Sequence, residues 1–245
     1  MFDLKPLLDQ LEVPGNFEIS LPEHFNFGLD VIDARASHGD KTAYIWVDRS
    51  AKRIEHHSFS DLSRASNRFA NLLHENGAAK GDASVVVLPR LPAWYEVIIG
   101  SIKAGVVAMP GTNLLTAKDI EYRSNKSLAT SVVVAAEHVV KIESIRHTCP
   151  SLRHFFLVGG TEPGWINFEE GCTAMSDELQ PAAVCRSRSD DAPTAYFTSG
   201  TTSFPKMVPR DHGYALAHAI TGRHWMDLGE DDVHWTLSDT GWACL

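Results

Sequence analysis

Short, strongly apolar runs alternate with stretches of helical length, and this alternation constrains the fold of the 245-residue chain more than any other feature. The apolar runs are 83–88, 106–109, 132–135 and 155–158. Continuous runs of this length are typical of strands that are buried on both faces of a parallel sheet. Between the runs lie the predicted helices 93–104, 116–124 and 137–147. The pattern predicts an α/β fold with mainly parallel sheets flanked by helices.

The N-terminal part has a different pattern. Residues 27–38 carry Leu29, Ile32 and Ala36 at helical spacing, which predicts a helix. Residues 41–46 and 53–58 flank a polar turn and predict a β-hairpin. A further helix follows, which we expect Ser60 and Asp61 to cap and which ends near Asn76 and Gly77.

The C-terminal third is less regular. Residues 159–193 are rich in Gly, Glu and Asp with little periodicity, so we expect a solvated surface connection. We expect a helix over 214–225 and a strand over 233–237, with a turn at 238–242.

Composition excludes several classes of function. With 22 Lys and Arg against 31 Asp and Glu, the net charge is −9, so the chain is a poor candidate for unspecific binding of nucleic acid or of an anionic membrane. The four cysteines and twelve histidines show no metal-binding spacing, and no metal site within the protein is expected. The longest apolar stretch, 97–110, contains Lys103 and is too short to span a bilayer. The N-terminus resembles neither a signal peptide nor a presequence, which favours a cytoplasmic protein, with the mitochondrial matrix as the alternative.

The stretch T-S-G-T-T-S-F-P-K is the strongest candidate for chemistry. It comprises Thr198, Ser199, Gly200, Thr201, Thr202, Ser203, Phe204, Pro205 and Lys206. Hydroxyls, backbone N–H groups of a glycine turn and a lysine ammonium can together hold a phosphate. The stretch lacks the second glycine and the hydroxyl after the lysine that a Walker loop needs, which disfavours a P-loop kinase or ATPase. From the residues alone, a phosphate site and an ordinary Ser/Thr-rich surface turn remain equal alternatives.

This stretch resembles the signature T-[SG]-G-[ST]-[ST]-G-x-P-K of the adenylate-forming enzymes, in which the loop holds the β- and γ-phosphates of ATP. Ser203 stands where the family usually has glycine. If this position requires a positive φ, a serine strains the loop.

Three more segments resemble the same family in the same order. They are 57–62, the S-I-K-A-G-V-V-A-M-P stretch at 101–110, and W-T-L-S-D-T-G-W at 235–242. The combination of M-P-G-T with S-D-T-G-W is similar to medium-chain acyl-CoA synthetases. Gly241 and Trp242 would then lie near the acyl chain, although a purely structural role for Trp242 is an equal alternative.

The resemblance implies that residues 1–245 are the N-terminal part of the large AMP-binding domain, without the small C-terminal domain. It implies ATP, Mg²⁺ and coenzyme A as ligands, with a fatty acid activated first to an acyl-adenylate and then to an acyl-CoA. Catalytic residues are not assigned, and we expect this chain alone to be inactive. The alternative is a truncated, non-catalytic product that binds nucleotide or acts through a partner. Arg90 is either a ligand of a CoA phosphate or, as we favour, a surface arginine.

Overall fold

The computed structural model describes residues 9, 20–198, 204–229 and 231–241. These residues form a seven-stranded sheet in the order β7-β6-β5-β3-β4-β8-β9 and a separate β1–β2 hairpin. The strands are β1 Thr42–Val47, β2 Ile54–Ser58, β3 Ala83–Val87, β4 Val107–Pro110, β5 Ser131–Ala135, β6 His154–Val158, β7 Ile166–Asn167, β8 Thr194–Thr198 and β9 Lys206–Arg210. The helices are η1 Phe27–Asp33, α2 Ala34–Ala36, α3 Phe59–Glu75, α4 Pro92–Ala104, α5 Ala117–Ser127, α6 Val139–Ile145, α7 Phe168–Ala174 and α8 His212–His224, with short 3₁₀ turns at Ala136–His138, Arg146–Thr148 and Pro181–Ala183.

The large sheet confirms the predicted parallel architecture. Strands β3 to β8 run parallel, and only the edge strand β9 is antiparallel, paired with β8. In the central register Val85 of β3 lies between Met109 of β4 and Val132 of β5. The strands β3 and β5 are buried at every position, as expected for a sheet that is covered on both faces.

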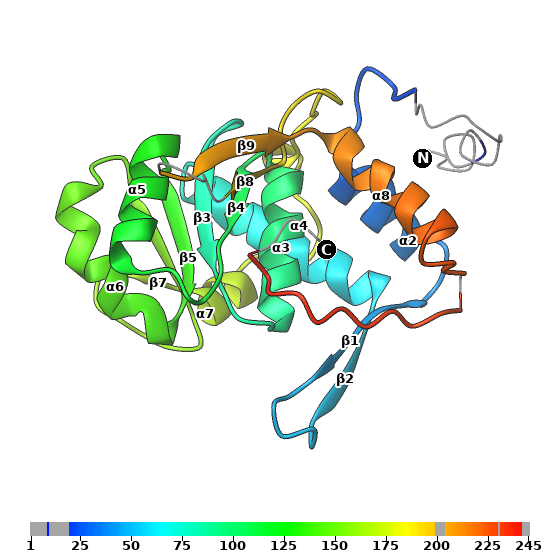
Figure 1. Ribbon diagram of the computed structural model, residues 1–245, viewed down its shortest axis with the longest axis horizontal. Helices are drawn as coiled ribbons and strands as arrows, with labels where there is room; N and C mark the ends of the chain where they lie inside the picture. Colours follow the sequence, from blue (N-terminus) through cyan, green and yellow to red (C-terminus); the bar gives the residue numbers. More distant parts are fainter. Residues whose placement is uncertain (1–8, 10–19, 199–203, 230, 242–245) are drawn as a thin grey trace.

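Helices cover both faces of the sheet (Figure 1). One core cluster contains residues of α3, α4 and α7, packed on Val86, Val133 and Phe156. The other contains residues of α5 and α6, packed on the alternate strand positions such as Val85 and Val132. The helix after β3 therefore covers one face and the helix after β4 covers the other. The neighbouring strands β3 and β4 form a topological switch point, where ligands bind in open α/β sheets.

The caps explain where the main helices begin and end. Helix α3 begins about two residues earlier than expected, because Ser58 and not Ser60 is its N-cap, in a reciprocal capping box with Asp61. Thr116 and Asp119 form the same arrangement at α5, where the sequence predicted the Thr116 cap. Helix α4 starts with Pro92 and ends at Gly105, whose φ of 73° suits a glycine C-cap.

The predicted helix over 27–38 is present, but its first part is a π-helix. Asn26 caps it, with Oδ1 accepting from the backbone N–H groups of Gly28 and Leu29. This layer is attached to α3 and α4 by Lys103, which is fully buried. The Lys103 ammonium lies 2.5 Å from Asp33 Oδ1 and donates to Asn67 Oδ1 at 2.7 Å. Burial lowers the pKa of Lys103, and the Asp33 carboxylate opposes that shift.

Two expectations for the C-terminal third were wrong. The segment 159–193 is not merely a solvated connection, because it contains β7 and α7, and Phe168 and Cys172 of α7 are buried in the core. No strand forms over 233–237, because within the described residues no other strand pairs with it. Val233, Trp235 and Leu237 keep the alternation of a strand, but all three are more than 70% exposed.

Candidate functional site

The T-S-G-T-T-S-F-P-K stretch, residues 198–206, is called the hydroxyl loop below. Its two ends lie side by side at the carboxyl end of β8. Thr198 is the register partner of Lys206 in the β8–β9 pair. Thr198 Oγ1 donates to the Lys206 carbonyl oxygen at 3.5 Å, and both residues are exposed. Residues 199–203, which include Ser199, Gly200, Thr201, Thr202 and Ser203, lie outside the described residues. The loop therefore begins at the carboxyl end of β8, and β8 is the neighbour of β4 in the sheet.

Helix α5 holds the exit of this loop. Tyr122 donates its hydroxyl proton to the Pro205 carbonyl oxygen at 3.0 Å. The Tyr122 ring stacks on Phe204, with 4.8 Å between ring centroids and 17° between ring planes. It also meets Phe197 of β8 edge-on at 6.2 Å. Tyr122 therefore contacts the end of β8 and the residues just before β9.

Arg123, the next residue of α5, brings a second positive charge to this region. Its guanidinium lies over the Phe197 ring, 4.7 Å from the centroid, in a cation–π contact. Burial lowers the pKa of Arg123, and Asp119 partly opposes that shift. The Lys206 and Arg123 side chains make this end of the sheet suited to an anion.

The S-D-T-G segment, residues 238–241, lies at the switch point between β3 and β4 of the same sheet. Thr240 is 6% exposed and donates its hydroxyl proton to the Leu88 carbonyl oxygen, just after β3, at 2.7 Å. A Cβ on Gly241 would overlap the backbone of Gly111 and Thr112, just after β4, and would lie 2.8 Å from Thr112 Cγ2. Only a glycine allows this close approach. Trp242, the other predicted acyl-pocket residue, lies outside the described residues.

Arg90 is an exposed arginine, and it makes contacts that the sequence did not predict. Its Nε donates to the Ser238 carbonyl oxygen at 3.0 Å, and its Nη2 donates to the Leu237 carbonyl oxygen. The Arg90 carbonyl oxygen in turn accepts from Trp46 Nε1 of the hairpin at 2.8 Å. The only sequence signal was the position of Arg90 directly after a strand, at the edge where sites form. Tyr122 gave no such signal, because its partners 204 and 205 are far away in the chain.

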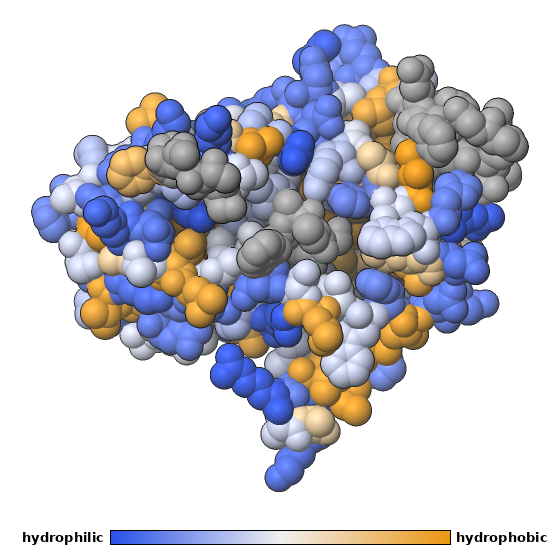
Figure 2. Space-filling model, in the orientation of Figure 1, coloured by the Kyte–Doolittle hydropathy of each residue, from blue (hydrophilic) through white to orange (hydrophobic). Residues whose placement is uncertain are grey.

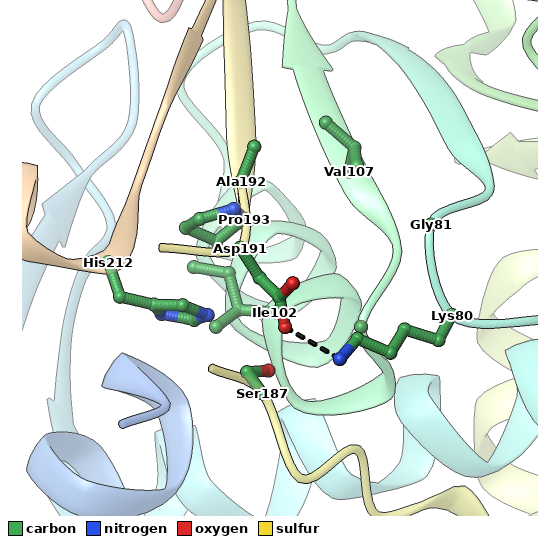
Figure 3. A pocket seen from close by; sticks show the side chains of 10 residues that line it. Lys80, Gly81, Ile102, Val107, Ser187, Asp191, Ala192, Pro193 and His212 are labelled. Atoms are coloured by element: carbon green, nitrogen blue, oxygen red, sulfur yellow. Dashed lines mark ion pairs between the residues drawn. The ribbon is translucent and has the colours of Figure 1, made fainter. Parts of the chain in front are cut away.

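A cavity of about 90 Å³ lies at the amino ends of the parallel strands, where β4 and β8 begin (Figure 3). Its lining includes Lys80, Asp191, Pro193 and His212, and Lys80 Nζ lies 2.6 Å from Asp191 Oδ2. Burial lowers the pKa of His212 to about 4, against smaller opposing effects of Asp191 and Asp211. The hydroxyl loop follows the other end of β8, so this cavity is separate from the predicted site.

The surface shows where apolar side chains reach solvent. Ile54 of the hairpin, Trp225 and Trp235 are all more than half exposed. Figure 2 shows apolar patches interrupting a mostly polar face. In the described part of the chain, no helix is both long enough and apolar enough to cross a bilayer. The same residues contain no cluster of three or more His, Cys, Asp or Glu side chains that is suited to a metal.

The sequence is similar to acyl-coenzyme A synthetases of mammals. It is 40% identical over 233 residues to the mouse (Mus musculus) protein acyl-coenzyme A synthetase ACSM5, mitochondrial, covering 91% of this chain and 39% of the mouse protein. It is 37% identical over 245 residues to the mouse protein acyl-coenzyme A synthetase ACSM4, mitochondrial, covering 96% of this chain and 41% of that protein. The chain thus spans about two fifths of the length of these curated relatives.

Solved structures of similar proteins have the same fold. The crystal structure of Brucella canis acyl-CoA synthetase matches with a TM-score of 0.82 and 25% identity, covering 99% of this chain and 42% of that chain. The anthranilate CoA ligase AuaEII in complex with anthranoyl-AMP matches with a TM-score of 0.72 and 26% identity, covering 84% of this chain and 38% of that chain. Residues 32–244 match the profile of the family described as AMP-binding enzyme. The chain is therefore a member of the AMP-binding enzyme family, as its motifs predicted.

Proposed function

We propose that this chain carries the ATP-phosphate and acyl-binding segments of an acid–CoA ligase that activates a medium-chain fatty carboxylate. The observation that carries the proposal is the common position of the two segments. The hydroxyl loop follows β8, and the S-D-T-G segment lies against the residues after β3 and β4. Since β3, β4 and β8 are adjacent and parallel, the end of β8 and the S-D-T-G segment lie at the same carboxyl end of one sheet. Carboxyl ends of parallel strands next to a switch point are where α/β proteins bind ligands.

The proposed reaction has two steps. A carboxylate oxygen attacks the α-phosphorus of ATP, the bond to the β-phosphate oxygen breaks, and pyrophosphate leaves with the electron pair. The thiol sulfur of coenzyme A then attacks the acyl carbon, the carbon–oxygen bond to AMP breaks, and the thiol proton is released to solvent. In the first step negative charge develops on the leaving pyrophosphate, so fixed donors and cations at that point accelerate the reaction.

The loop residues suit that task. We assign Thr198, Ser199, Gly200, Thr201, Thr202, Ser203, Phe204, Pro205 and Lys206 to the phosphates of ATP. Lys206 is exposed beside Thr198, so a phosphate can reach its side chain from solvent. Mg²⁺ is a hard cation that prefers oxygen ligands, and it would be held by the phosphate oxygens.

The acyl side is assigned to Gly241 and Trp242. The close approach of Gly241 to Thr112 supports this assignment, because it brings the segment to the residues after β4. The anthranoyl-AMP in the AuaEII structure supports an acyl-adenylate as the ligand class. The names of the mammalian relatives, which include the word mitochondrial, favour the mitochondrion over the cytoplasm as the compartment.

ATP binding to the purified 245-residue chain tests the phosphate site. Removing the Lys206 ammonium should weaken Mg-ATP binding by about tenfold or more, because a hydrogen bond to a charged group contributes about 1.5–3 kcal/mol and about 1.4 kcal/mol is tenfold. The measurement is the dissociation constant by calorimetry for wild type and Lys206→Ala. Lys52→Ala is the matched control, since Lys52 is an exposed lysine in the turn between β1 and β2 of the separate hairpin. Equal affinities of Lys206→Ala and wild type would contradict the assignment.

Pyrophosphate release separates catalysis from binding. With hexanoate, Mg-ATP and coenzyme A, we predict that the 245-residue chain alone releases no hexanoate-dependent pyrophosphate while still binding ATP. That result supports a nucleotide-binding chain that does not complete the reaction by itself. Hexanoate-dependent release would instead show that the chain catalyses the first step unaided. Absence of both ATP binding and release would contradict the proposal.

A further inference from the structure

The segment 237–241 spans the switch point of the sheet. On one side it contacts the loop between β3 and α4, through Thr240 and the Leu88 carbonyl oxygen. On the other side Gly241 lies against Gly111 and Thr112, in the loop between β4 and α5. These two loops lead to helices on opposite faces of the sheet. The segment therefore occupies the part of the sheet edge where a ligand is expected.

Few contacts hold this segment in place. Within the described residues the stretch 233–241, which includes this segment, pairs with no strand, and Trp235 and Leu237 are 82% and 77% exposed. Hydrophobic burial thus contributes little to the placement of its first residues. Figure 1 shows the chain returning from α8 past the base of the hairpin to reach the sheet. Its position depends on hydrogen bonds from the residues that it crosses.

Arg90 supplies two of these hydrogen bonds. Through Nε and Nη2 it donates to the carbonyl oxygens of Ser238 and Leu237, two successive residues. A planar guanidinium can bind two successive carbonyls with a fixed geometry, which a lysine ammonium cannot do. The backbone of Arg90 is itself fixed, because its carbonyl oxygen accepts from Trp46 Nε1. Arg90 thereby connects the hairpin, the β3 end of the switch point and the S-D-T-G segment.

We propose that Arg90 is a positioning residue for the carboxylic acid substrate. It holds residues 237–241 against the ends of β3 and β4, and so fixes where Gly241 meets the acyl chain. Arg90 itself does not contact the reacting atoms. This inference rests on the proposed function and assigns to the acid side a residue that neither motif contains. The Nε and Nη2 donors are used by the protein's own backbone, which disfavours Arg90 as a ligand of a CoA phosphate.

The test separates the acyl side of the site from its nucleotide side. Two dissociation constants are measured for the 245-residue chain, one for Mg-ATP and one for hexanoyl-sulfamoyl-adenosine, a stable mimic of the acyl-adenylate. We expect Arg90→Gln to weaken binding of the mimic about tenfold and to change binding of ATP less than about twofold, because displaced positioning groups commonly cost this much or more. Arg90→Lys should retain part of the affinity for the mimic. Arg64→Gln is the control, since Arg64 is an exposed arginine of α3 in a surface ion pair with Asp61.

Thr240→Val is a second variant, which keeps the shape of the side chain and removes the donor to Leu88. It should weaken binding of the mimic in the same direction, and it keeps the test decisive if Arg90→Gln does not fold. Hydrogen exchange of peptides from 233–241 is measured in parallel, and both variants should exchange faster there with unchanged rates in β3 and β5. Equal loss of ATP and mimic affinity, or unchanged exchange in 233–241, would overturn the positioning role. If wild type binds neither ligand, the proposed function fails first, and the exchange data then show separately whether the Arg90 contacts hold the segment.

Discussion

The central strands form the sheet, and the segment 233–241 lies against the carboxyl ends of two of them, β3 and β4. The two regions are held in place by different interactions. Val86, Val87 and Val133 are fully buried between two layers of helices. In the segment, by contrast, Val233, Trp235 and Leu237 face solvent, and the attachment consists of hydrogen bonds from Arg90 and Thr240 and the close fit of Gly241. Burial fixes the strands cooperatively, whereas individual polar contacts place the segment.

This difference separates global stability from local geometry. A change in the core alters the free energy of unfolding of the whole sheet, because each side chain there packs against several others. A change in the segment alters the position of a few residues and leaves the core intact. The proposed acid-binding residues belong to the second class. Their function should therefore be sensitive to substitutions that barely change stability.

The largest expected effect comes from the core. Phe69 is completely buried and packs edge-on against Phe156, with 5.6 Å between ring centroids, and against Phe168. Phe69→Ala should lower the free energy of unfolding by about 3–5 kcal/mol, because it removes apolar contacts and leaves a cavity. Urea denaturation followed by circular dichroism measures the change. Ile54→Ala, at a position 59% exposed in the hairpin, is the control and should cost less than about 1 kcal/mol. Similar losses for the two variants would contradict the contrast.

The next effect tests a buried polar junction between η1 and α8. His212 is 1% exposed, and its Nδ1 accepts from the Phe27 backbone N–H at 3.3 Å, so it ties α8 to η1. Burial lowers the pKa of His212 from 6.5 to about 4. The negative charges of Asp191 and Asp211 act to raise this pKa, and the positive charge of Lys80 acts to lower it. The unfolded chain therefore binds the proton more readily than the folded chain. The contribution to stability is fully present above pH 6.5 and is lost as pH falls toward 4.

We expect His212 to contribute a loss of about 2 kcal/mol in the free energy of unfolding between pH 7 and pH 5, from the conversion of 1.36 kcal/mol per pKa unit. The measurement is urea denaturation at several pH values for wild type and His212→Asn, whose side-chain oxygen can still accept from Phe27. The variant should show a flatter pH dependence over this range. Parallel pH curves for the two proteins would show that His212 does not titrate as the structure implies.

The smallest global effect is expected in the segment. In Gly241→Ala the new Cβ meets the backbone of Gly111 and Thr112, which cannot move away because β4 is held in the sheet. The segment must shift instead, so hydrogen exchange in 233–241 should rise while the free energy of unfolding changes by less than about 1 kcal/mol. Gly222→Ala is the matched control, because a Cβ there meets only Leu228 Cδ1 at 4.0 Å. A large loss of stability in Gly241→Ala would place the segment in the cooperative core.

The sequence predicted the parts of the fold that depend on burial. Runs such as 83–88 and 132–135 correspond to β3 and β5, because continuous apolar residues have few alternatives to a buried parallel strand. Helix α7 was missed because only Phe168 and Cys172 of its seven residues are buried, while Glu169, Glu170 and Gly171 obscure the periodicity. Two inward positions one turn apart are too few for a pattern to stand out.

The segment 233–237 shows the opposite error. Its alternating apolar residues are those of a strand, but a strand also needs a pairing partner, which periodicity cannot report. The candidate site is a prediction from its motifs, and the structure describes its border residues Thr198, Phe204, Pro205, Lys206 and Gly241. The contacts of Tyr122 and Arg90 could not be predicted, since they join residues more than 80 positions apart in the chain.

The burial of Lys103 has a consequence for the chemical reactivity of the protein. Its amine lies under η1 and is held by Asp33, Asn67 and the Ser63 carbonyl oxygen, with none of its surface open to solvent. An acylating reagent can reach this nitrogen only when η1 separates from α3 and α4. Exposed lysines such as Lys52 and Lys126 need no such opening. The rate at which Lys103 is labelled, relative to these, therefore reports how often the N-terminal layer detaches while the sheet remains folded.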